Sequence, residues 1–165
     1  MIGKTETLIT EAIQKAANGV VVAVPSKNRQ LWAKVRAIIS FGYLKSKPYL
    51  EKYTHRHLWR DVVFVTARAS QNEYVLDLTF DIIEKFGLRT QVCLIGKYDI
   101  RFQHPEEGSS TTLAIRPDHA LRQFLCGRNN TYTIFDNYVW EDHTFKQKQE
   151  LRQLAHVANP LRGRI

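Results

Sequence analysis

Short apolar runs rich in β-branched residues, separated by segments of helical periodicity, are the feature that most limits what this chain can fold into. A continuous apolar run covers residues 20–24, and strands are also expected at 61–67, through Val62 to Val65, and at 131–135, before Asp136. Continuous apolar runs of this kind are typical of strands buried on both faces of a parallel sheet. Strands that alternate with helices indicate an α/β protein. The sequence therefore predicts a mainly parallel sheet flanked by helices.

The segments between these runs complete the expected order of elements. Apolar residues at helical spacing predict a first helix over residues 5–18, ended by Gly19. Further helices are expected at 30–39, 74–86, 118–125 and 141–157, and further strands at 91–95, 99–103 and 111–115. The last two strands are expected to pair across the polar turn 104–110. Residues 74–80 also alternate like a strand, and the structure of 41–59 is left open.

Length and composition predict one domain. A chain of 165 residues with 44% apolar content can bury one sizeable core, whereas two domains would both be marginal. We expect this single domain over residues 1–158 and a loosely ordered basic tail at 159–165.

No targeting or membrane-spanning segment is evident in the sequence. No run approaches the ~20 apolar residues of a membrane span, and the first residues lack the apolar core of a signal peptide. We expect a cytoplasmic protein with no membrane partner. Cys93 and Cys126 are flanked by apolar residues and lack metal-ligand spacing, so both are expected to be buried, reduced thiols.

The positive charge of the chain is concentrated in one segment. Between Lys27 and Arg60 there are nine basic residues and one acid, Glu51, while 15 basic residues and 15 acids lie elsewhere. Concentrated positive charge is typical of a surface for a polyanion such as DNA or RNA. The candidate nucleic-acid-binding residues are Lys27, Arg29, Lys34, Arg36, Lys45, Lys47, Lys52, Arg56 and Arg60. A solvated face, or a surface for an acidic protein or a second copy of the chain, would use the same residues.

Aromatic residues are interleaved with these charges, and their rings could stack on unpaired bases. They are Trp32, Phe41, Tyr43, Tyr49, Tyr53 and Trp59. Because of their size, Trp32 and Trp59 are expected to belong to the core instead.

The tripeptide Gly3-Lys4-Thr5 stands at the start of the first expected helix. A phosphate-binding loop needs a glycine for close backbone approach, a lysine for the β and γ phosphates and a hydroxyl for Mg²⁺. The free N–H groups and the dipole of a helix N-terminus favour an anion at the same point. Because this tripeptide is common, its meaning depends on the rest of the chain.

Two later segments supply a family resemblance. Residues 20–29, Val-Val-Val-Ala-Val-Pro-Ser-Lys-Asn-Arg, look like the second strand and polar motif of helicases and phage large terminases. Residues 125–136 end in Ile-Phe-Asp and are similar to the strand that delivers the Mg²⁺-binding aspartate in that superfamily. The chain thus resembles a degenerate P-loop NTPase of viral or phage origin. The resemblance implies ATP and Mg²⁺ as cofactors, with Gly3, Lys4 and Thr5 at the nucleotide, Thr5 and Asp136 at the metal, and Asp136 as the catalytic residue.

The chain departs from the family pattern in two ways. The family's loop reads G-x-x-x-x-G-K-T after a central strand, but here only two residues precede Gly3, so the fold is expected to lack the usual first strand. The family also follows its aspartate with a glutamate that polarises water, where this chain has Asn137. Glu141 and Asp142 could replace that glutamate only if the chain folds back after Asp136. We expect them instead in the first turn of the last helix, where the dipole favours carboxylates.

Other constellations are weaker. His55 and His57 have strand-like ligand spacing without further ligands nearby. A metal-dependent nuclease built on Asp136, Glu141 or Asp142 with Lys146 is an alternative that nothing in the spacing requires. The leading hypothesis is a nucleic-acid-associated P-loop NTPase relative. The alternative is a non-enzymatic basic protein, such as a phage accessory or inhibitory factor, that occupies nucleic acid or a partner protein.

Overall fold

The computed structural model describes residues 3–23 and 54–161. The chain divides into two compact units, and the larger one comprises residues 3–19 and 58–161 of the described part. Residues 20–23 and 54–57 belong to the smaller unit. The expected helix at 30–39 lies outside the described residues, as do most of the basic segment and Trp32. The expectation of one domain over 1–158 therefore stays a prediction.

The larger unit is built on a five-stranded mixed sheet. In spatial order the strands are β4 (Val92–Gly96), β5 (Asp99–His104), β6 (Ser109–Pro117), β3 (Asp61–Thr66) and β7 (Thr131–Phe135). The central strand β3 is parallel to both β6 and β7. The pairs β4–β5 and β5–β6 are antiparallel, since each is joined by a short turn. The α/β class is confirmed, but the sheet is mixed where we expected a mainly parallel one.

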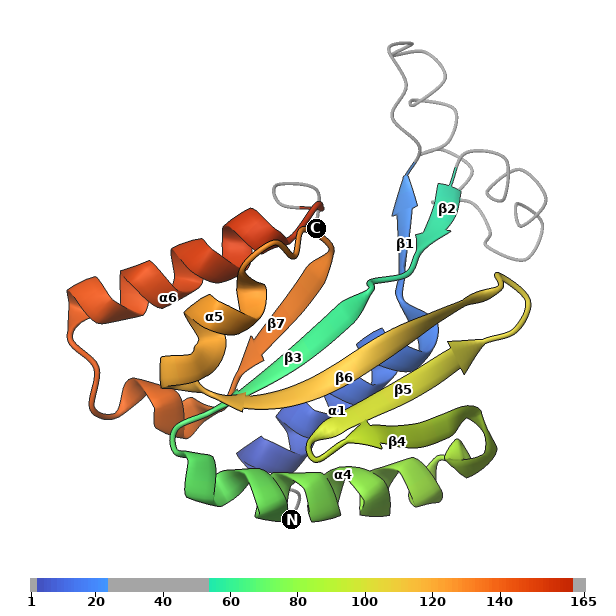
Figure 1. Ribbon diagram of the computed structural model, residues 1–165, viewed down its shortest axis with the longest axis horizontal. Coiled ribbons are helices and arrows are strands. Elements are labelled where there is room, and N and C mark those ends of the chain that lie inside the picture. The colour runs from blue at the N-terminus through green and yellow to red at the C-terminus, as the bar shows by residue number, and fades with distance from the viewer. Residues whose placement is uncertain (1–2, 24–53, 162–165) are drawn as a thin grey trace, which may run out of the picture. The chain divides into compact units, whose positions relative to one another are not determined.

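Helices cover both faces of this sheet (Figure 1). On one face lie α1 (Lys4–Asn18) and α4 (Asn72–Lys85), and on the other lie α5 (Leu121–Leu125) and α6 (Phe145–Ala158). Short 3₁₀ turns link these elements: η1 (Ala69–Gln71), η2 (Arg89–Gln91), η3 (Asp118–Ala120) and η4 (Asn137–Trp140). Gly19, with a φ of 65°, ends α1 by donating its N–H to Lys15, as the sequence predicted.

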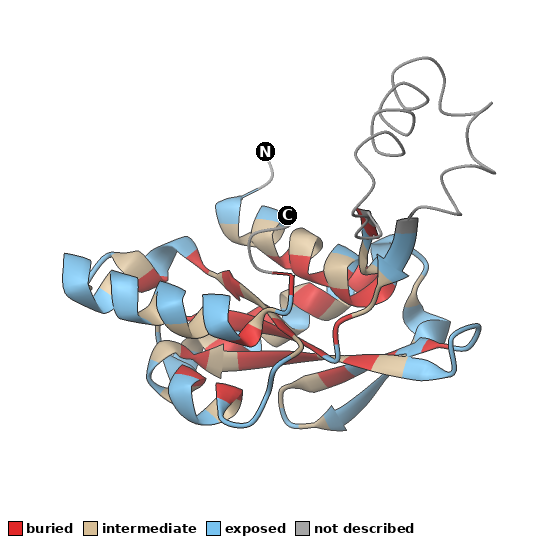
Figure 2. Cartoon of the chain, turned by 90° about the horizontal axis from the view of Figure 1, so that it is seen from above, coloured by how far each residue is buried: buried red, intermediate tan, exposed pale blue. Residues whose placement is uncertain are grey.

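The core lies in two layers, one on each side of β3. Because successive side chains of a strand point to opposite faces, Val63 and Val65 pack in the cluster that includes Leu121, Leu125 and Ala158. Val62 and Phe64 therefore point to the opposite face, on which α1 and α4 pack. Figure 2 shows buried residues along the strands and on the inner sides of the helices. Every residue of β3 is buried, which explains the continuous apolar run from Val62 to Val65 within it.

The described part of the smaller unit is an antiparallel pair of strands, β1 (Val20–Ala23) and β2 (Thr54–His57). The prediction that residues 20–24 form a strand buried on both faces of a parallel sheet is wrong. Val22 is buried, but Val21 is 68% exposed, so only one face of β1 is covered. Its apolar run therefore arises in a two-stranded ladder and not in the main sheet.

Other expectations also need correction. Cys93 and Cys126 are both exposed free thiols, because β4 is an edge strand and Cys126 ends the short helix α5. Residues 159–161 do not form the expected loose tail, since Leu161 is buried and its N–H donates to the Asn159 side chain, and the rest of that tail lies outside the described residues. None of the helices in the described ranges has the length and apolar character needed to cross a bilayer.

Candidate nucleotide site

The start of α1 meets the carboxyl end of β7. Asp136 follows β7 directly, and its backbone N–H donates to Val65 O at 3.0 Å, which extends the parallel ladder with β3 by one step. Thr5 lies in the first turn of α1. Its Oγ1 donates a hydrogen bond to Asp136 Oδ1 at 3.0 Å, across 131 positions of sequence. The two residues expected to hold a metal are therefore in direct contact.

Asp136 is a buried carboxylate with few compensating contacts. It is 2% exposed, and this burial raises its pKa above the ordinary value of 3.8. Hydrogen bonds from the Thr5 hydroxyl and the Asn137 backbone N–H act in the opposite direction, because they favour the charged form. The net increase in pKa means that the folded protein disfavours the ionised side chain. A cation bound beside Asp136 would relieve that cost.

The N-terminus of α1 is a candidate position for an anion. Gly3 is the N-cap residue, with extended backbone, and no side chain caps the helix. The first backbone bond of the helix runs from Thr7 N–H to Gly3 O, at 3.1 Å. A Cβ built on Gly3 would meet no atom of the described residues within 4 Å, so these residues leave the backbone of Gly3 uncrowded. Such a terminus favours phosphate oxygens.

A pocket of about 400 Å³ lies at this position. It is lined by residues from three parts of the chain: Gly3, Lys4, Thr5 and Glu6 from the start of α1, Tyr74 from α4, and Asn137, Tyr138 and Glu141 after β7. Both tyrosine side chains are more than half exposed. The sequence predicted Gly3, Lys4 and Thr5 at one site with Asp136. The first three residues line this pocket, whereas Asp136 does not line it and contacts Thr5 beside it.

The donor set fits Mg²⁺. A hydroxyl and a carboxylate are hard oxygen ligands, and magnesium at phosphate sites uses one or two carboxylates together with phosphate oxygens and water. Among residues 3–23 and 54–161 no group of three or more His, Cys, Asp or Glu side chains could hold a metal ion. His55 and His57 lie on β2, in the smaller unit, outside any such group.

Glu141 lies at a position that differs from the one expected from the sequence. The expectation that Glu141 and Asp142 lie in the first turn of the last helix is wrong, since α6 begins at Phe145. A capping box between Thr144 and Gln147 fixes that start. The chain does turn back after Asp136, through η4, and this turn brings Glu141 to the pocket. The other pocket residues missed, Glu6, Tyr74 and Tyr138, carried no motif.

Only two of the nine candidate nucleic-acid-binding residues are described, and neither lies at the pocket. Arg56 is on β2 in the smaller unit. Arg60 is exposed and precedes β3, with its N–H bonded to Asn130 O at the amino ends of β3 and β7. It therefore lies at the opposite end of the sheet from Asp136. Trp59, as expected, is a core residue.

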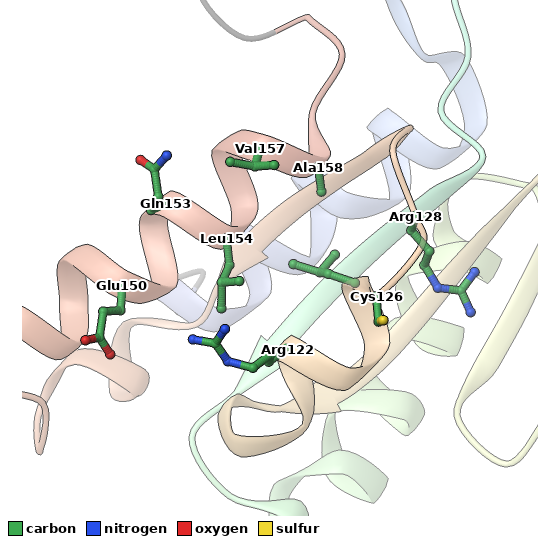
Figure 3. Close-up of a pocket in the computed structure, with 9 residues that line it drawn as sticks. Arg122, Cys126, Arg128, Glu150, Gln153, Leu154, Val157 and Ala158 are labelled. Atoms are coloured by element: carbon green, nitrogen blue, oxygen red, sulfur yellow. The ribbon is translucent and has the colours of Figure 1, made fainter.

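A second pocket, of about 480 Å³, lies between α5 and α6 (Figure 3). The side of α6 supplies Leu154, Val157 and Ala158, and α5 with the turn after it supplies Arg122 and Cys126. None of the residues predicted to bind nucleotide or metal lies here. We therefore regard the smaller pocket at Gly3, Lys4 and Thr5 as the candidate site.

Comparison of the chain with protein-family models, with curated proteins and with solved structures found no match.

Proposed function

We propose that this chain is a P-loop-like protein that binds a magnesium nucleotide, ATP in the first instance, at the start of α1, and that it associates with nucleic acid. The observation that carries the proposal is the 3.0 Å hydrogen bond between Thr5 and Asp136 at an uncapped helix N-terminus. A hydroxyl, a buried carboxylate and a lysine around one helix start are the groups that a metal-bound phosphate requires.

Each residue has a distinct role in this proposal. Gly3 leaves room for the phosphates to approach the backbone, and the first N–H groups of α1 bind their oxygens. Lys4 neutralises the β and γ phosphates. Thr5 and Asp136 hold Mg²⁺, which when bound polarises the phosphate oxygens. The burial of Asp136 supports this role, because a buried carboxylate costs free energy when no cation neutralises it.

The first test is thermal stabilisation by ATP with Mg²⁺. At 100 times the dissociation constant, a ligand adds ~2.7 kcal/mol to the free energy of unfolding, and the melting temperature of a domain of this size should rise by about 5 to 11 °C. Lys4→Ala is expected to remove most of this shift, because it removes the cation that binds the phosphates. Lys85→Ala is the matched control, since Lys85 is an exposed lysine in the last turn of α4.

The outcome separates the two classes of function. A shift that depends on Lys4 and Mg²⁺ supports the nucleotide site. If ATP with Mg²⁺ produces no shift in the wild type, the nucleotide proposal is overturned. The chain is then best explained as a non-enzymatic basic protein that acts by occupying nucleic acid or a partner protein in the cytoplasm.

Nucleic-acid binding through the basic segment predicts a strong dependence on salt. The segment holds nine basic residues against one acid, so its contacts to DNA or RNA should release counterions. We expect the logarithm of the binding constant to fall linearly with the logarithm of salt concentration. Each Lys→Ala or Arg→Ala change that removes one phosphate contact should reduce the slope by about 0.9 on duplex DNA. Fluorescence anisotropy with labelled oligonucleotides measures this, and an affinity independent of salt would exclude phosphate contacts.

A further inference from the structure

Glu141 occupies a position at the proposed nucleotide site that its place in the sequence does not reveal. It lines the same pocket as Lys4 and Thr5, five positions after Asp136. The turn that brings it there is η4, in which Val139 N–H donates to Asp136 O at 3.0 Å. Glu141 N–H in turn reaches Tyr138 O at 3.4 Å. The backbone from Asp136 to Glu141 is therefore a hydrogen-bonded turn and not an extended loop.

Packing fixes this turn in place. Val139 is 1% exposed and belongs to the core cluster on the side of α5 and α6. The ring of Trp140 lies 4.8 Å from that of Phe135, the last residue of β7. With these two side chains anchored on one side of the sheet edge, Asn137, Tyr138 and Glu141 line the pocket. The location of the Glu141 carboxylate thus follows from core packing as much as from local sequence.

Among the described residues, neither an ion pair nor a helix dipole accounts for the position of Glu141. It lies before the capping box of α6, outside the first turn where a carboxylate would interact with the helix dipole. Within the described parts of the chain it makes no ion pair. Its neighbour Asp142 is also exposed but does not line the pocket. The two adjacent carboxylates therefore differ in their access to the pocket, which only Glu141 lines.

We infer that Glu141 is the general base for hydrolysis of the nucleotide bound at this pocket. This inference rests on the proposed function. Phosphoryl transfer to water needs a residue that orients the water and accepts its proton. The water oxygen forms a bond to the γ phosphorus, the bond from that phosphorus to the β–γ bridging oxygen breaks, and the electron pair leaves with the nucleoside diphosphate. The proton released by the water passes to the Glu141 carboxylate, and the products are the diphosphate and inorganic phosphate.

Asn137 cannot perform this step, although it also lines the pocket. A side-chain amide has no site that accepts a proton near neutral pH, so it can only orient water or phosphate through hydrogen bonds. Glu141 is the only carboxylate besides Glu6 among the residues that line this pocket. Glu6 lies in the first turn of α1 and is accounted for by the helix dipole.

The test compares three variants with the wild type: Glu141→Gln, Glu141→Asp and the matched control Asp142→Asn. ATP binding with Mg²⁺ is measured by calorimetry, and phosphate release is measured at saturating ATP. We expect Glu141→Gln to lower kcat by about 10² to 10⁴-fold, the usual contribution of general-base catalysis, with little change in Kd. Glu141→Asp should keep part of the activity, and Asp142→Asn should be close to wild type. Since Glu141 is exposed, all variants should melt near the wild-type temperature.

The possible outcomes distinguish this inference from the proposed function. If the wild type does not bind ATP, the proposed function itself fails, and the inference fails with it. If ATP binds but is not hydrolysed, or if Glu141→Gln hydrolyses it at the wild-type rate, the nucleotide site stands and the role of Glu141 is overturned. A parallel loss of activity in Asp142→Asn would also overturn it, since a general effect of local charge would then explain the result.

Discussion

Replacing Asp136 with asparagine is expected to abolish stabilisation by ATP with Mg²⁺, while the free protein becomes at least as stable as the wild type. Asparagine has the same shape, and its side-chain oxygen can still accept the 3.0 Å hydrogen bond from Thr5. It lacks the charge that Mg²⁺ requires. The same substitution removes a buried carboxylate that the folded protein holds at a cost in free energy. Function and stability should therefore change in opposite directions.

The stability gain should depend on pH in a defined direction. Burial raises the pKa of Asp136, so the folded state holds its proton more tightly than the unfolded state does. Protonated Asp136 therefore makes a contribution to the stability of the folded state that is fully present below the ordinary pKa of 3.8. This contribution is lost as the pH rises through the raised pKa. Asparagine stays neutral at every pH. The difference in unfolding free energy between Asp136→Asn and wild type should be largest near neutral pH and should vanish as the pH falls below about 3.8.

Asp61 provides the matched control for this experiment. It is also a buried carboxylate with a raised pKa, but it lies at the amino end of β3 and pairs with Arg128 at 3.4 Å. Asp61→Asn should leave the thermal shift produced by ATP with Mg²⁺ unchanged. Urea denaturation at several pH values and thermal melts with and without ligand measure both effects. Retention of the full shift in Asp136→Asn would contradict the metal role proposed for Asp136.

The largest effect on stability is expected from Leu113→Ala. Leu113 lies on β6, is 1% exposed and pairs with Val62 of the central strand. Removing its side chain leaves a cavity between the sheet and the α1–α4 layer. We expect the free energy of unfolding to fall by about 2–5 kcal/mol. Urea denaturation measures the change, and near-ultraviolet circular dichroism shows whether the remaining protein keeps its tertiary packing.

Leu94→Ala is the control with identical chemistry. Leu94 pairs with Ile100, which in turn pairs with Leu113, so the three residues lie in one row across the sheet. Leu94 is 52% exposed, because it belongs to the edge strand β4. Its replacement should change stability by no more than about 0.5 kcal/mol. Equal losses in the two variants would show that the helices cover this row of the sheet differently from the structure described here.

Elements whose pattern is local could be predicted from the sequence. The helical spacing of Ile9, Ala12 and Ile13, ended by a glycine, determines α1, and the apolar runs determine β3 and β7. The meeting of Lys4, Thr5 and Asp136 followed from a resemblance and from the rule that parallel strands share a carboxyl edge. The 3.0 Å contact agrees with it, although the nucleotide function itself stays a prediction.

Features that depend on distant partners could not be predicted. The run at residues 20–23 has the composition of a buried strand, but composition does not reveal whether its partner is the main sheet or β2. The exposure of Cys93 results from β4 being an edge strand, which its own sequence does not show. The position of Glu141 depends on Val139 packing in the core cluster. In each case the local sequence does not show which other part of the chain packs or pairs with the segment.

The place of β3 in the sheet has a consequence for biosynthesis. Its two neighbours, β6 and β7, both follow it along the chain, so β3 leaves the ribosome before either strand that will cover its edges exists. The antiparallel ladder of β4, β5 and β6 is made of contacts close in sequence and can form early, whereas the parallel pairing of β3 with β7 is distant and slow. A nascent chain that stops before residue 131 exposes one edge of β3, a strand that is buried at every residue in the folded protein. Truncated products of this gene should accordingly aggregate more readily than the full chain.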